Sequence, residues 1–205
     1  MGKDPFKTKN VVTAEKGSVG TTTYAITGST LEEVYNQIQS KGPAVDGKRY
    51  AGATQCTLTG FDEAYEVTSE GEDVEFTGYA RFNKSKLKFN CLITLPKFTD
   101  FRQKLSDEDQ RTWSTYLSGV AAHEQEHVDD YEAEITRWAG EVADLRGEAT
   151  GKDAKRAEAA AKAALGKAFK AAFTPADNTK RLKDSARKLD AGTGHGPVLK
   201  YKSSQ

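Results

Sequence analysis

The stretch WSTYLSGVAAHEQEHVDDYEAEITRW, residues 113–138, decides the fold of the second half of this chain. Its apolar residues recur mostly at spacings of three and four, which is the period of one face of an α-helix. The pattern predicts a long amphipathic helix over about residues 107–146. The same stretch contains the pattern H-E-x-x-H, formed by His123, Glu124 and His127.

The spacing of this pattern suits a metal site. Two histidines four residues apart lie one turn apart on the same helix face, so both imidazoles can bind one ion. The carboxylate after the first histidine projects to the side, where it can reach a water molecule at the metal. The pattern therefore predicts His123 and His127 as zinc ligands and Glu124 as the general base of a hydrolase. The alternative is chance spacing on a polar helix, but two of the chain's three histidines complete the motif.

A catalytic zinc ion needs a third protein ligand and an open position. One candidate is His195, the remaining histidine, which lies in GTGHGP. Its flanking glycines let the backbone approach closely, so that an imidazole can project into a cleft. The other candidates are carboxylates in or after the long helix: Asp130, Glu134, Glu141, Asp144, Glu148 and Glu158. The histidine count favours His195, and Asp130 can instead orient an imidazole from outside the ligand set.

Two tyrosines are candidates for donating a hydrogen bond to the oxyanion that forms during hydrolysis. Tyr131 lies on the predicted helix and Tyr201 lies near the C-terminus. Packing or exposure to solvent is the simpler interpretation of each. Asp190 and Thr193 are expected to shape the turn that carries His195.

The first half of the chain carries β-strand patterns. TTTYAIT predicts a strand over residues 21–27, and residues 48–99 alternate apolar and polar residues between turn-rich segments. Between these regions, the sequence predicts a helix that begins after Thr30 and ends at Gly42. The first half is therefore expected to form an antiparallel sheet with one short helix.

Two more helices are expected after the long one, over residues 153–173 and 177–190. This order of elements predicts an α+β fold, in which an antiparallel sheet precedes a long H-E-x-x-H helix and further helices. The expected organisation is a flexible arm (1–18), a single metallohydrolase domain (19–198) and a mobile tail (199–205). The domain has a strand-rich half (about 19–100) and a helical half (about 104–198), and the resemblance described below implies that it is zincin-like.

The two cysteines, Cys56 and Cys91, both lie in strand-like segments. A disulfide between strands would suit an exported protein. The alternative is a pair of buried thiols. A zinc role is disfavoured, because structural zinc sites draw their cysteines from tight C-x2-4-C turns and two thiolates would close the open position.

Composition excludes some classes of function. The chain has 30 basic and 30 acidic residues, so no global field favours nucleic acid or an anionic membrane as a partner. No apolar run approaches the roughly 20 residues that a membrane span needs. The N-terminal MGKDPFKTKN is charged but has no apolar stretch after it, so no signal peptide is predicted.

The chain also resembles a bacterial family of unknown function whose members are described as secreted zinc-dependent proteases. The resemblance begins at YAITGSTLEEVYNQIQSKGPAVDGKRYAGAT, includes KLKFNCLITLPKF and WSTYLSGVAAHEQEHVDD, and ends near DAGTGHG, covering about residues 21–197. The family's C-terminal signature D-x-x-T-x-H-G is matched by Asp190, Thr193, His195 and Gly196. The resemblance implies an α+β metalloprotease-like domain of the zincin type. It also implies a secreted or periplasmic protein, whose leader has been removed or which is exported by another route.

These observations together predict a metallopeptidase that uses Zn2+ and Glu124 to hydrolyse bonds in a peptide or protein substrate. A second hypothesis is a zinc-binding module without turnover, such as cargo or a toxin effector carried by a secretion or injection apparatus. A third is a peptidoglycan amidase or peptidase, which the lack of any resemblance to a wall-binding module disfavours.

Overall fold

The structure, a computed structural model, describes residues 5–6, 10–99, 105–193 and 196–201 of the 205-residue chain. The chain forms two compact units, each built from three separate segments of the sequence. Unit 1 consists of Met1–Lys16, Leu58–Phe89 and Glu132–Asp184, and unit 2 consists of Gly17–Thr57, Asn90–Tyr131 and Ser185–Gln205.

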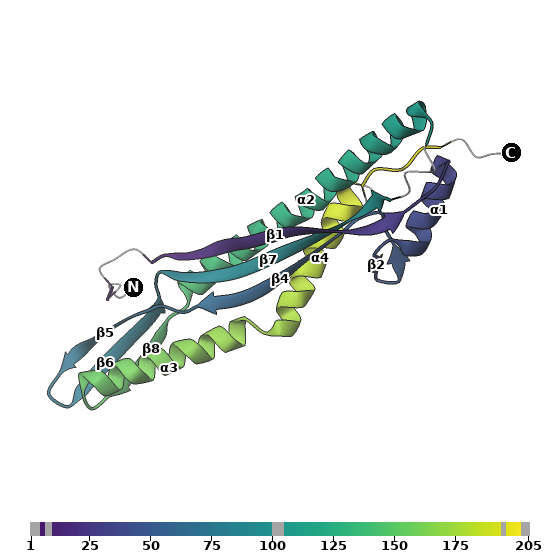
Figure 1. Cartoon of the computed structure of the whole chain (residues 1–205). Coiled ribbons are helices and arrows are strands. Elements are labelled where there is room, and N and C mark those ends of the chain that lie inside the picture. Colours follow the sequence, from purple (N-terminus) through teal and green to yellow (C-terminus); the bar gives the residue numbers. More distant parts are fainter. Residues whose placement is uncertain (1–4, 7–9, 100–104, 194–195, 202–205) are drawn as a thin grey trace. The chain divides into compact units, whose positions relative to one another are not determined.

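Both helices and strands are present, so the predicted α+β class is confirmed (Figure 1). The elements in chain order are β1 (Val12–Ile26), α1 (Leu31–Lys41), β2 (Ala44–Val45), β3 (Lys48–Arg49), β4 (Ala53–Asp62), β5 (Tyr65–Glu72), β6 (Glu75–Phe82), β7 (Ser85–Phe98), α2 (Asp107–Asp144), β8 (Gly147–Gly151), α3 (Ala154–Ala172) and α4 (Pro175–Thr193).

Strands β1, β7 and β4 form a three-stranded sheet in that order. The predicted alternation is clearest in β7, where buried side chains occupy every second position from Ser85 to Ile93. That period of two is expected for a strand with one face against a core. Cys56 of β4 and Cys91 of β7 are joined by a disulfide, with their Cα atoms 4.0 Å apart. The bond therefore links neighbouring strands of this sheet within unit 2.

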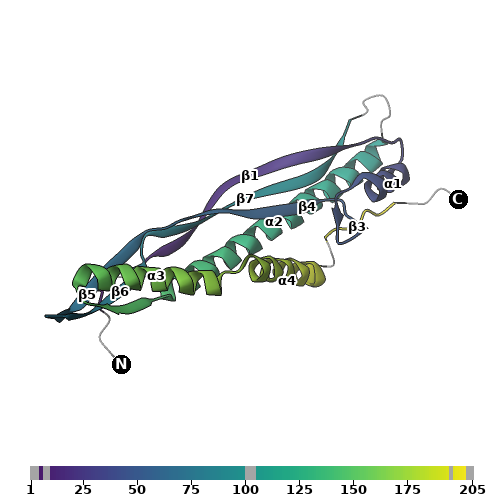
Figure 2. The ribbon, with the colours of Figure 1, turned by 90° about the horizontal axis from the view of Figure 1, so that it is seen from below.

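Unit 1 contains the antiparallel sheet β5–β6–β8, against which α3 packs (Figure 2). The contact is close because small residues meet on both sides. Ala157 and Ala161 of α3 are fully buried over Gly78, Gly147 and Gly151, where any added Cβ would collide with the helix backbone. The alanines of α3 therefore have two effects. They favour the helix, and their small side chains let it lie close to the sheet.

Unit 2 is held together by an apolar cluster that joins α1 to the first part of α2. Thr30 caps α1 by accepting a hydrogen bond from the Glu33 backbone N–H, and Gly42 ends the helix, as predicted. The buried members of the cluster are Ile26, Leu31, Val34, Ile38, Leu105, Trp113, Tyr116, Val120 and Leu199.

The helical boundaries differ from the predicted ones in a few places. Helix α2 runs unbroken over Asp107–Asp144, two residues shorter than predicted, and Ser106 caps its start by accepting from the Asp109 N–H. Helix α4 begins at Pro175, in the predicted break, because proline suits the first helical position and Thr174 caps the helix by accepting from the Asp177 N–H.

Some described residues of the predicted arm and tail take part in strands or in buried contacts. Strand β1 already begins at Val12, and the Phe6 ring is buried beneath the Arg81 guanidinium. At the other end, the Leu199 side chain is 4% exposed and belongs to the unit 2 cluster. Single apolar residues such as Phe6 and Leu199 carry no periodic signal in polar segments, so the sequence does not report their burial.

The sequence also predicts neither β8 nor the β2–β3 hairpin. The hairpin turn places Asp46 at φ 48° and Gly47 at φ 80°, which is the left-handed geometry that the Asp-Gly pair favours in tight two-residue turns. Strand β8 pairs with β6, and its residues lie in the short gap between two predicted helices.

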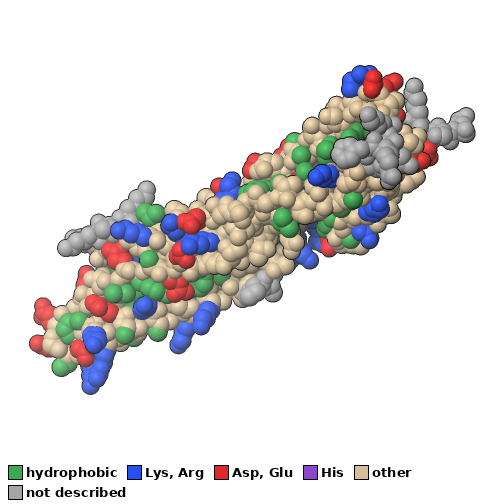
Figure 3. Space-filling view, viewed as in Figure 1, with side chains coloured by type: hydrophobic (Ala, Val, Ile, Leu, Met, Phe, Trp, Pro, Cys, Tyr) green, Lys and Arg blue, Asp and Glu red, His purple; other side chains and the backbone are tan. Residues whose placement is uncertain are grey.

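No helix in the part of the chain that the structure describes is both long enough and apolar enough to cross a membrane. On the face drawn in Figure 3, basic and acidic side chains are interspersed. This mixture fits the equal numbers of acidic and basic residues in the sequence.

Candidate metal centre

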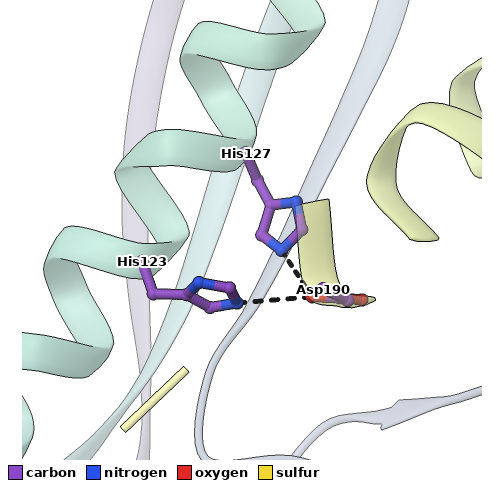
Figure 4. Close-up of side chains that lie close together, drawn as sticks. All are labelled: His123, His127 and Asp190. Atoms are coloured by element: carbon purple, nitrogen blue, oxygen red, sulfur yellow. Dashed lines mark hydrogen bonds and ion pairs between the residues drawn. The ribbon is translucent and has the colours of Figure 1, made fainter. Parts of the chain in front are cut away.

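The two motif histidines project from α2 toward one carboxylate of α4 (Figure 4). The Asp190 Oδ1 atom lies 3.1 Å from His127 Nε2 and 3.3 Å from His123 Nε2. These three side chains form the only cluster among the described residues whose His, Cys or acidic ligand atoms could together hold a metal ion. All three residues belong to unit 2.

The two distances to Asp190 Oδ1 are compatible with a shared metal ion and also with direct pairing of the carboxylate with the rings. Ligand atoms about 2.0–2.1 Å from a tetrahedral zinc ion are separated by about 3.3–3.4 Å, close to both observed distances. Asp190 contacts the Nε2 atom of both rings, whereas a carboxylate that orients a metal-bound histidine contacts the other ring nitrogen. On His123 the opposite nitrogen, Nδ1, lies 3.8 Å from a Glu126 carboxylate oxygen, which is too long for a hydrogen bond.

The local sequence explains why α2 presents these rings inward. Val120 is 3% exposed and lies three residues before His123, so the histidine continues the buried stripe of the helix. His123 itself is 8% exposed. Asp190 lies in the last turn of α4, and Ser185 of the same helix donates a 2.6 Å hydrogen bond to Asp130 of α2. That bond ties the C-terminal part of α4, which carries Asp190, to the helix that carries the histidines.

Glu124 is buried beside the cluster, with 4% of its surface exposed. Burial raises the pKa of its carboxyl group, while the Thr54 hydroxyl and the two histidines oppose that rise. The Thr54 hydroxyl lies 2.8 Å from Glu124 Oε2 and 2.9 Å from the Glu124 backbone oxygen. Thr54 therefore holds the carboxylate from the opposite side of the site, from β4.

The segment that leads to Thr54 must pass very close to Glu124. A Cβ atom at Gly52 would lie 2.6 Å from Glu124 Oε1, so glycine is the residue that fits there. Tyr24 donates a 2.9 Å hydrogen bond to the Ala51 carbonyl, and burial raises the pKa of the Tyr24 phenol, which keeps it a donor. This segment forms one wall of the site.

The cluster opens into a cavity of about 310 Å³ in unit 2. Helix α1, the β2–β3 hairpin, the start of β4, α2, the end of α4 and residues 196–199 all line it. Its polar lining includes His123, Glu124, His127 and Asp190, and much of the remainder is apolar or aromatic. A concave site that is partly apolar with a few convergent polar groups is the usual form of a ligand or substrate pocket.

The structure places the other predicted site residues as follows. His195 lies outside the described residues, although Gly196 packs against the His123 ring, where an added Cβ would lie 3.0 Å from Cδ2. Asp130 accepts from Ser185 instead of from an imidazole. Tyr131 is buried in α2 and does not line the cavity, whereas Tyr201 lies against Tyr35, with ring centroids 5.2 Å apart.

Three of the carboxylates considered as third ligands have other partners in unit 1. Glu134 and Glu141 both pair with Arg181, and Glu158 accepts a hydrogen bond from Ser69. Sequence reasoning missed Asp190 as a partner of the histidines because α4 was expected to end there. The sequence pattern that does mark Asp190 is the C-terminal family signature D-x-x-T-x-H-G, which contains it.

The fold and the cluster define an α+β protein with two histidines and a carboxylate gathered in a pocket. The chain belongs to the family described as "Bacterial protein of unknown function (DUF922)", which matches residues 21–196. No curated protein and no solved structure gave a match. The match confirms a bacterial family of unknown function, and its description assigns no activity.

The raised pKa of Glu124 predicts how the metal-free protein responds to pH. The folded chain holds this proton more tightly than the unfolded chain, so its free energy of unfolding falls as the pH rises from 4.5, the ordinary value, through the folded-state pKa. A Glu124→Gln variant has no such proton to lose. We expect the metal-free variant to become more stable than the metal-free parent across this window, and the two curves to converge below it. Urea unfolding between about pH 4 and 8 measures the difference, and a pH-independent difference would contradict the assignment.

Proposed function

We propose that this protein is a zinc-dependent metallopeptidase with a zincin-like arrangement of its site. One observation carries the proposal: the Nε2 atoms of His123 and His127 meet Asp190 Oδ1 at 3.3 and 3.1 Å, beside the buried Glu124. Three protein ligands would leave a tetrahedral zinc ion one position for water or substrate. His195 stays a candidate ligand from the sequence.

Each residue has a role in the proposed reaction. His123, His127 and Asp190 would hold the zinc ion, which when bound would act as a Lewis acid that acidifies water and polarises a carbonyl group. Glu124 accepts the proton from the attacking water and passes it to the leaving amine. Its raised pKa makes its carboxylate a better proton acceptor than an exposed glutamate. Thr54 is a positioning residue, because its hydroxyl restrains the carboxylate from β4.

We further infer that the protein acts outside the reducing cytosol. The disulfide between Cys56 and Cys91 lies in unit 2, which also contains the candidate centre. Disulfides persist in secreted and periplasmic proteins and are rare in the cytosol. The inference is consistent with a secreted peptidase and with an exported effector.

Metal analysis combined with a peptidase assay tests the proposal. We expect about one zinc ion per chain and cleavage of an unfolded protein such as casein. Removal of zinc by a chelator should abolish cleavage, and added zinc should restore it. Zinc binding without cleavage of casein would favour the module without turnover, and cleavage confined to peptidoglycan fragments would favour the amidase. Absence of bound zinc would overturn the proposal.

A further inference from the structure

We propose that Arg49 forms an anion subsite in the cavity, which recognises a carboxylate of the substrate within a few residues of the cleaved bond. The inference rests on the proposed function, because it treats the cavity as the substrate site. Arg49 lies on β3 and lines the same cavity as His123 and Glu124. The carboxylate could belong to an acidic side chain or to the C-terminus of a peptide.

The guanidinium is held in place by the backbone. Its Nη1 atom donates a 2.6 Å hydrogen bond to the Gly42 carbonyl at the end of α1. Gly42 cannot readily change, since an added Cβ would lie 2.6 Å from the Ile38 carbonyl oxygen. A helix C-terminus is a favourable place for a cation. The anchor uses one nitrogen, and the remaining N–H groups of the planar guanidinium suit a carboxylate.

Within the described part of the chain, no carboxylate forms an ion pair with Arg49. The acidic residue of its own hairpin, Asp46, pairs instead with Arg187 at 3.1 Å. Other arginines of the described chain do pair with acids, including Arg81 with Glu66. Arg49 is thus a cation on a cavity wall whose partner is not supplied by the described fold.

The chain limits how far this cation is from the proposed chemistry. Arg49 precedes Gly52 by three residues, so their Cα atoms are separated by at most about 11 Å. Gly52 is the residue that packs against the Glu124 carboxylate. An extended peptide advances about 3.3 Å per residue, and the Arg49 side chain adds its own reach, so a carboxylate on Arg49 should lie within a few residues of the bond that Glu124 serves.

Binding of three labelled peptides to the metal-free Glu124→Gln chain tests the subsite without turnover. The first carries a central glutamate and an amidated C-terminus, the second has glutamine in that place, and the third has the glutamine and a free C-terminal carboxylate. Zinc is left out because a carboxylate could bind it directly. Fluorescence anisotropy gives the three affinities, and the first and third peptides distinguish the two sources of the anion.

We expect one of the two anionic peptides to bind about tenfold more tightly than the neutral peptide at low salt. Arg49→Gln should remove that preference, and Arg49→Lys should keep part of it, since an ammonium group lacks the paired donors. Lys48→Gln is the matched control, because it removes the same charge from the same strand without lining the cavity. Equal affinity for all three peptides, no binding of any, or a preference that survives in Arg49→Gln would overturn the subsite. None of these outcomes depends on whether the protein cleaves peptides.

Discussion

Glu124→Gln should lower kcat for peptide cleavage by about 10²–10⁴-fold while the protein still binds zinc, because general-base catalysis contributes an effect of that size. The glutamine keeps the shape of the side chain and can still accept a hydrogen bond from Thr54, which lies 2.8 Å from the carboxylate oxygen. It cannot take a proton from water. The loss should therefore appear in kcat, with zinc content and fold unchanged.

Steady-state kinetics on a casein-derived peptide, together with metal analysis, makes this measurement. The matched control is Glu108→Gln, which makes the same chemical change at an exposed position in the first turn of α2. The control should cleave as the parent does. If Glu124→Gln retained full activity with bound zinc, Glu124 would not be the base.

Much of this site could be predicted from the sequence because its signals are local. The spacing of His123 and His127, the helix that carries them and the glutamate between them all fall within one turn and a half. Periodicity and N-cap residues also predict α1 and α2 to within two residues of their bounds. In each case, neighbouring residues in sequence set the structure.

The rest of the site comes from contacts between residues far apart in the sequence, which no periodic pattern reports. Thr54 meets Glu124 across 70 residues, and Asp190 meets His127 across 63. The sequence alone predicts that Asp190 shapes a turn, because a polar residue at a helix end usually has that role. The Asp-Gly pair of the β2–β3 hairpin is a local signal, since this pair favours tight two-residue turns, and Arg49 lies in that hairpin.

The third ligand of the proposed zinc ion is decided by removing its two candidates separately. Asp190→Ala should weaken zinc binding by at least about a hundredfold, since the loss of a residue that only supports a ligand already costs about 10–100-fold. Competition with a zinc-binding dye measures the affinity. Lys188→Ala is the matched control, an exposed position of α4 two residues before Asp190. It should bind zinc as tightly as the parent.

His195→Ala, measured in the same way, separates two kinds of zinc site. If zinc binding depends on Asp190 and not on His195, three protein ligands hold the ion and one position remains for water, as catalysis requires. If both substitutions weaken binding by a similar factor, four protein ligands complete a tetrahedral shell, which is the arrangement of structural zinc and would favour the module without turnover. Full zinc affinity in Asp190→Ala would show that the 3.1 and 3.3 Å contacts pair charges in the metal-free chain and do not mark a ligand. The number of protein ligands therefore bears directly on whether this protein is an enzyme.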